Sequence, residues 1–142
     1  MKLGVAEFLI VSWPAKRGTL QQWSQFLASS PVPVLLQMPL ENKYLKHLKM
    51  VKPYGCLFPQ GSFHQLSDSS VLMKNFDRWQ SSGIQMFVEE SLPLKNIKDL
   101  QKAPVDGVVF FEDHKKVKTW MKQLVQLDAW GLTVQIYGPH GR

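Results

Sequence analysis

The chain has 142 residues, of which 44% are hydrophobic and 11% aromatic, and its formal net charge is +6 at pH 7. This composition excludes intrinsic disorder, which requires low hydrophobicity, and the length is enough for one substantial core. A single cysteine, Cys56, excludes an internal disulfide, and no CxxC or Cys/His cluster indicates structural zinc. We therefore expect residues 1–142 to form one domain.

Six apolar runs predict β-strands. Most lack strict polar alternation, which is typical of parallel strands covered on both faces. The first run is interpreted as a buried strand and not a signal peptide, because Glu7 interrupts it and no small-residue cleavage site follows. No run reaches the roughly 20 apolar residues of a membrane span. The predicted strands are 6–11, 32–38, 55–58, 84–88, 107–111 and 132–137.

Helical patterns lie between these runs. Thr19 is the predicted N-cap of the first helix, and Asp113 that of the last, which ends at Gly131. A middle helix begins near Asp68 and ends at Gly83. Apolar residues at helical spacing are Leu20, Trp23 and Leu27; Leu45, Leu48 and Val51; Leu72, Phe76 and Trp79; Ile97 and Leu100; Val117, Trp120, Met121, Leu124 and Leu127.

This alternation predicts an α/β fold with a parallel sheet, because successive strands start about 22 to 29 residues apart. Two architectures fit: an incomplete or irregular β/α barrel, with fewer units than the common eight, and an open doubly wound sheet. In both, ligands bind at the carboxyl ends of the strands.

Polar side chains gather just past the predicted strand ends. Carboxylates there can act as acid and base or hold a divalent cation. In the alternative interpretation, Glu112 and Asp113 only favour a helix N-terminus, and Gly61-Ser62 is a plain turn and not an anion site. The candidate catalytic residues are Glu41, Glu89, Asp113 and His140. The candidate ligand-binding residues are Gln37, Gln60, Gly61, Ser62, Glu90, Glu112 and Tyr137. His47 and His64 are expected to be solvated.

Two lysine-rich segments carry much of the positive charge. They are interpreted as solvated helix faces or as a surface for an anionic polymer such as cell-wall material or RNA. Nucleic acid is the less favoured partner, because the chain has no Arg-rich run, zinc-finger spacing or RNP-like motif. The lysines are Lys43, Lys46, Lys49 and Lys52, and Lys115, Lys116, Lys118 and Lys122.

Five short segments follow the order of motifs in a known family. The run from Val34 to Glu41 is similar to VLLHLPME, Tyr54 to Phe63 to VGVNNHMGSRF, and Met86 to Glu89 to FFLDS. Val109 to Asp113 is similar to VFLDD, and Val134 to His140 to AIGIGHPH. Together they resemble the divergent polysaccharide deacetylases, relatives of NodB-type carbohydrate esterases. The resemblance implies a NodB-like β/α barrel whose relatives are metal-dependent.

The chain departs from that family at its metal site. Nothing before Ala6 matches the family's Asp-Asp pair, and Gln37, Pro59 and Gly138 stand where the family has histidine. These side chains supply no imidazole for zinc or for proton transfer. The resemblance therefore implies a degenerate deacetylase-like domain, non-catalytic or glycan-binding, with no cofactor predicted and a divalent metal as the alternative.

Two other functions stay open from the residues alone. One is an enzyme with Glu41 and Glu89 as acid and base, and the other is the basic module for an anionic polymer. The expected partners are a glycan or such a polymer, and a second copy of the chain through the sheet edge left by the missing first strand. The sequence does not predict a location.

Overall fold

The structure, a computed structural model, describes residues 8–139, in which six strands alternate with helices. The strands are β1 (Leu9–Ser12), β2 (Val34–Gln37), β3 (Gly55–Phe58), β4 (Gln85–Glu90), β5 (Gly107–Phe111) and β6 (Thr133–Tyr137). The α-helices are α1 (Leu20–Ser29), α2 (Asn42–Leu45), α3 (Ser70–Ser81), α4 (Ile97–Lys102), α5 (His114–Thr119) and α6 (Met121–Ala129). Two 3₁₀ helices, η1 (Lys46–Lys49) and η2 (Ser62–Asp68), complete the connections.

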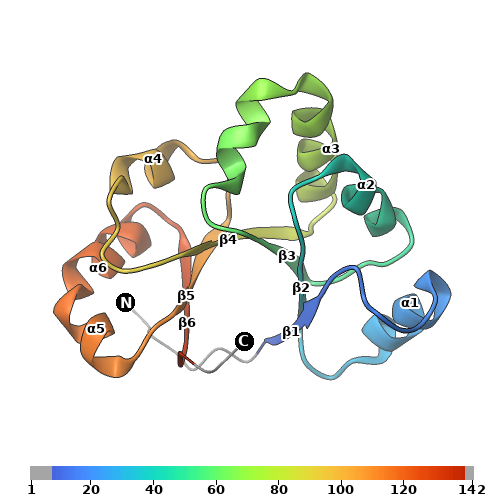
Figure 1. Ribbon diagram of the computed structural model, residues 1–142, viewed down its shortest axis with the longest axis horizontal. Helices are drawn as coiled ribbons and strands as arrows, with labels where there is room; N and C mark the ends of the chain where they lie inside the picture. Colours follow the sequence, from blue (N-terminus) through green and yellow to red (C-terminus); the bar gives the residue numbers. More distant parts are fainter. Residues whose placement is uncertain (1–7, 140–142) are drawn as a thin grey trace.

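The six strands form one parallel sheet in the order in which they occur along the chain. Figure 1 shows the sheet curled, with the helices around its outer side and β1 and β6 at its two edges. The prediction of an incomplete β/α barrel is confirmed. The doubly wound alternative is wrong, because the strand order never reverses and so the crossover helices stay on one face.

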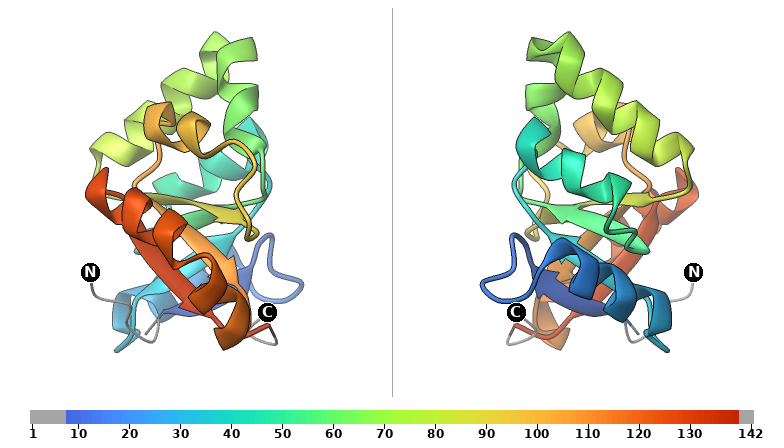
Figure 2. Two further views of the ribbon diagram at one scale, coloured as in Figure 1. Left: turned by 90° about the vertical axis from the view of Figure 1, so that its left-hand side faces the viewer. Right: turned by 90° about the vertical axis from the view of Figure 1, so that its right-hand side faces the viewer.

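Most of the core lies between the sheet and the outer helices. One buried cluster joins the outer residues of β2 and β3 to α1, α2, η1 and α3, and a second joins β4 and β5 to α4, α5 and α6. Cys56 belongs to the first cluster and is fully buried, as expected for a small apolar side chain in a strand. Figure 2 shows these helices packed along the same side of the curled sheet.

The concave face of the sheet holds a smaller cluster. It consists of Leu35, Leu57, Phe87 and Val109, one from each of four neighbouring strands, with Phe111 and other half-buried residues against it. Gly107 makes room for this cluster: a Cβ atom there would lie 2.6 Å from the Phe87 ring and would also collide with the Thr133 carbonyl oxygen. Glycine is therefore required where Phe87 fills the interior.

The helix ends largely follow the predicted caps. Thr19 and Gln22 form a capping box at α1, and the Asp113 carboxylate accepts a hydrogen bond from the Lys116 N–H at α5. The middle helix begins near Asp68 as predicted, and Ser69 is its N-cap. The last predicted helix is two helices, interrupted at Trp120.

Three further expectations need correction. β4 is longer than predicted and includes Glu89 and Glu90, because both residues pair with β5. His47 is not solvated: it is half-buried, and its Nδ1 accepts a hydrogen bond of 3.0 Å from the Trp13 indole. The helix predicted around Leu45 and Leu48 is a short α-helix continued by a 3₁₀ turn.

Among residues 8–139, no helix has the length and apolar character needed to cross a bilayer.

Candidate functional site

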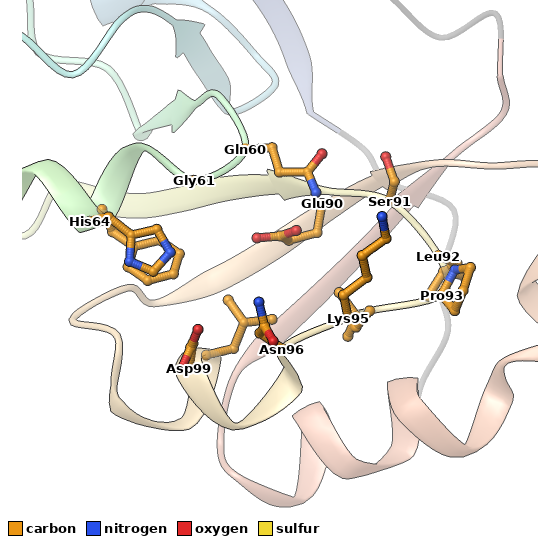
Figure 3. Close-up of a pocket in the computed structure, with 13 residues that line it drawn as sticks. Gln60, Gly61, His64, Glu90, Ser91, Leu92, Pro93, Lys95, Asn96 and Asp99 are labelled. Carbon is orange, nitrogen blue, oxygen red and sulfur yellow. The ribbon is translucent and has the colours of Figure 1, made fainter.

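A pocket of about 420 Å³ opens where the loops after β3 and β4 meet α4. It is lined by Gln60, Gly61, Phe63 and His64, by the run from Glu90 to Asn96, and by Asp99 and Leu100. Figure 3 shows the Gln60 and Glu90 side chains near each other, with Lys95, Asn96 and Asp99 across the cavity. The pocket therefore lies at the carboxyl ends of two adjacent parallel strands, as expected for a ligand site in this architecture.

Glu90 is the most perturbed acid of the pocket. It is half-buried, and burial raises the pKa of its carboxyl from 4.5 to about 7. Two smaller effects are included in this pKa: a hydrogen bond with the Gln60 side chain lowers it, and the charge of neighbouring Glu89 raises it. Near neutral pH a large share of Glu90 is thus protonated, so its carboxyl can both donate and accept hydrogen bonds.

This shift predicts a pH-dependent stability. Because the folded-state pKa of Glu90 is raised, its contribution is fully present below pH 4.5 and is lost as the pH rises through 7. Relative to Glu90→Gln, the wild-type free energy of unfolding should therefore fall by about 1–2 kcal/mol over that range, allowing for solvent screening. Urea unfolding of both proteins at several pH values measures it, and parallel pH profiles would contradict the assignment.

The segment between β4 and α4 forms one wall of the pocket, and two side chains hold it in place: Glu112, which follows β5, and Gln123 of α6. The Leu92 N–H donates to Glu112 Oε1 at 3.1 Å. The Leu94 N–H donates to Gln123 Oε1 at 2.7 Å, and Gln123 Nε2 donates back to the Leu94 carbonyl at 3.1 Å. Since Leu92 and Leu94 are also buried, this wall is formed before any ligand binds.

Three of the seven predicted ligand-binding residues line the pocket, namely Gln60, Gly61 and Glu90. Gly61 has a φ of 78°, and the Ser62 N–H donates to the Pro59 carbonyl at 3.1 Å. Ser62 is itself buried, and its hydroxyl donates to the same carbonyl at 2.5 Å. Both hydrogen-bond donors of Ser62 are bound to the Pro59 carbonyl. Residues 59–62 therefore form a turn, and the Ser62 N–H is not available to an anion.

The other predicted ligand-binding residues lie elsewhere. Glu112 supports the pocket wall from behind and forms an ion pair of 3.6 Å with Lys116. Gln37 is the half-buried last residue of β2, level with Leu57 of the concave cluster. Tyr137 also packs against that cluster, with its ring 5.4 Å from the Phe111 ring, and burial raises its pKa to about 12.

None of the predicted catalytic residues within the described part of the chain lines the pocket. Glu41 is exposed just before α2, and Asp113 is occupied as the cap of α5. Glu89 alternates with Glu90 along β4 and so lies on the same concave face as Phe87. His140 lies outside the described residues.

The described residues do not form a side-chain cluster that fits a metal ion. Within the range 8–139, no three His, Cys, Asp or Glu side chains are grouped so that they could hold one. The positions at which the resemblance implies histidine ligands carry Gln37, Pro59 and Gly138. No metal-dependent step can therefore be assigned to these side chains.

Several pocket residues were not predicted from the sequence. Phe63 and His64, whose rings lie 4.4 Å apart, continue past the strand-end segment into η2, and Asp99 belongs to the weakly patterned helix α4. Lys95 and Asn96 come from a loop whose course the strand pattern does not define. The signal that could have identified Phe63 is its adjacency to the candidate residues Gly61 and Ser62.

No protein-family model matches this chain, and no curated protein matches it either.

Proposed function

We propose that this chain is a non-catalytic carbohydrate-binding domain of a degenerate NodB-like type, with one or two sugar units seated in the pocket beside Glu90. The observation that carries the proposal is the pairing of Gln60 with a half-buried, partly protonated Glu90 at the carboxyl ends of β3 and β4. An amide and a neutral carboxyl offer donors and acceptors that match the hydroxyl groups of a sugar.

The remaining lining supports the same class of ligand. Asn96 and Asp99 add polar groups across the cavity, whereas Phe63, Leu92 and Pro93 add apolar surface. A volume of about 420 Å³ falls within the usual range for small-molecule pockets. A ligand with polar edges and apolar faces, as a sugar ring has, complements such a mixed lining.

The family resemblance supports the location as well as the ligand class. Gln60 and Gly61 lie within the motif-like segment from Tyr54 to Phe63, and Glu90 directly follows the motif-like segment from Met86 to Glu89. The pocket thus forms from segments that resemble the family's site, in a chain that lacks the corresponding imidazoles.

Calorimetric titration with neutral β-linked oligosaccharides, with and without N-acetyl groups, tests the proposal. We expect saturable binding by the wild type and about tenfold weaker binding by Gln60→Ala, which loses a hydrogen bond within the pocket. Gln65→Ala is the matched control, because Gln65 is exposed in η2 outside the pocket lining. If no oligosaccharide binds, or if both variants weaken binding equally, the proposal is wrong.

A second candidate function is acid–base catalysis at the same pocket. The observation favouring it is the pKa of Glu90 near 7, which suits proton transfer at neutral pH. Glu90→Gln separates the two functions: a binding domain keeps its oligosaccharide affinity and shows no turnover before or after the substitution. An enzyme shows turnover in the wild type and loses it in the variant while binding persists.

A further inference from the structure

A basic surface crosses the outer side of the molecule away from the pocket. It comprises five exposed lysines and one exposed arginine of α2, η1, the loop after η1 and α3, namely Lys43, Lys46, Lys49, Lys52, Lys74 and Arg78. Between Glu41 and Asp68 the sequence has no acidic residue. Within residues 8–139 none of these six cations forms an ion pair. The exposed Asp77 of α3 lies between Lys74 and Arg78, so six cations and one acid leave a net positive charge on this side.

The packing of α2 against α3 joins the two groups of cations. Asn75 of α3 donates to Asn42 of α2 at 2.8 Å, and the two helices run side by side in Figure 1. Lys74 and Arg78 flank Asn75 on α3, four residues apart and therefore on one stripe of the helix. The opposite side of α3 faces the loop between α4 and β5, where Gln80 donates to the Pro104 carbonyl at 2.7 Å.

Exposed apolar side chains border the same surface. Val71 and Met50 are 61% and 51% exposed, more than any other large apolar side chain in the described part of the chain. Val71 lies one turn before Lys74 on the stripe that continues to Arg78, and Met50 follows Lys49. Cations interleaved with exposed apolar groups are typical of surfaces that lie in the headgroup region of a bilayer.

We propose that the basic surface binds peripherally to anionic lipid membranes. The lysines would lie among the headgroups, with Met50 and Val71 inserted just below them. Charge complementarity selects an anionic partner, and the apolar pair selects a bilayer over a nucleic acid. A surface that reads or stacks on nucleic-acid bases would instead need arginine forks or exposed rings, whereas this surface has one arginine. The inference is independent of the carbohydrate pocket.

The second lysine-rich segment provides a matched comparison. Lys116 of α5 pairs with Glu112, and the α5 N-terminus carries Asp113, so acidic groups offset the charge there. Exposed Lys115 and Lys118 in this segment can be neutralised with the same change in net charge as Lys46 and Lys49. The two double variants therefore separate a defined surface from overall positive charge.

Cosedimentation with phosphatidylcholine vesicles, with or without 30% phosphatidylserine, tests the inference. At low ionic strength, the chain should bind only the anionic vesicles, and each lysine in contact should contribute about fivefold to affinity. The double variant Lys46→Gln/Lys49→Gln should therefore bind about 25-fold more weakly, whereas Lys115→Gln/Lys118→Gln should change binding less than about twofold.

Three results would overturn the inference. They are no binding to the anionic vesicles, equal loss in the two double variants, and tighter binding to single-stranded RNA than to the vesicles at the same salt concentration. Circular dichroism of each variant confirms that the substitutions leave the fold intact.

Discussion

Replacing Gly107 by alanine is expected to lower the free energy of unfolding by about 3 kcal/mol or more. A Cβ atom at this position would lie 2.6 Å and 2.8 Å from two carbons of the Phe87 ring and would collide with the Thr133 carbonyl oxygen of the next strand. The ring sits in a closely packed interior and the carbonyl is part of the β6 backbone, so neither can move away cheaply. Urea unfolding followed by circular dichroism measures the change.

Gly138→Ala is the control for that substitution. Gly138 follows β6, is exposed, and a Cβ atom there would meet nothing within 4 Å. Its free energy of unfolding should stay within about 0.5 kcal/mol of the wild type. Equal, small effects of the two substitutions would show that the sheet is not curled tightly over Phe87.

Removing the Phe87 ring is expected to lower the free energy of unfolding by a comparable amount, because it leaves a cavity where the Gly107 substitution overpacks the core. Phe87 is 1% exposed and is the largest member of the buried concave cluster. Phe87→Ala should therefore cost about 3–5 kcal/mol, the sum of lost apolar burial and the cavity that remains. Thermal and urea unfolding both report the loss.

Phe26→Ala serves as the comparison for Phe87, because Phe26 is 43% exposed on α1. It should lower stability by less than about 1 kcal/mol. The double variant Gly107→Ala/Phe87→Ala should be less destabilised than the sum of the single variants, since one collision disappears with the ring. Simple additivity would contradict the contact between these two positions.

The fold class was predictable because its determinants are local in the sequence. Six apolar runs, the caps at Thr19 and Asp113, and the turn glycines Gly83 and Gly131 together specify the alternation of strands and helices. The curl of the sheet was left open by these local signals, which fitted both an incomplete barrel and a doubly wound sheet. It depends on which side chains fill the concave face. The Phe87 ring fills the space that Gly107 leaves free, and this fit appears only when β4 and β5 are paired.

The candidate site was predictable in its location and less so in its members. The strand-end rule named Gln60 and Glu90, which the structure brings together in one pocket, because the carboxyl ends of parallel strands share one edge. It could not tell Glu89 from Glu90. Both belong to β4, so their side chains point to opposite faces of the sheet, and only the structure shows which of them faces the pocket. It also missed Gln123, whose side chain binds the backbone of Leu94 in the pocket wall, far away in the sequence.

The proposed carbohydrate site is the pocket between η2 and α4. Mapping of backbone amide chemical shifts tests this site most directly. The ¹⁵N-labelled chain is titrated with the oligosaccharide that binds most tightly in calorimetry. Saturable shifts confined to residues 60–64 and 90–100 are the predicted result. Shifts centred instead on the concave face around Glu89 and Tyr137, or no saturable shifts at all, would contradict a carbohydrate site beside Glu90.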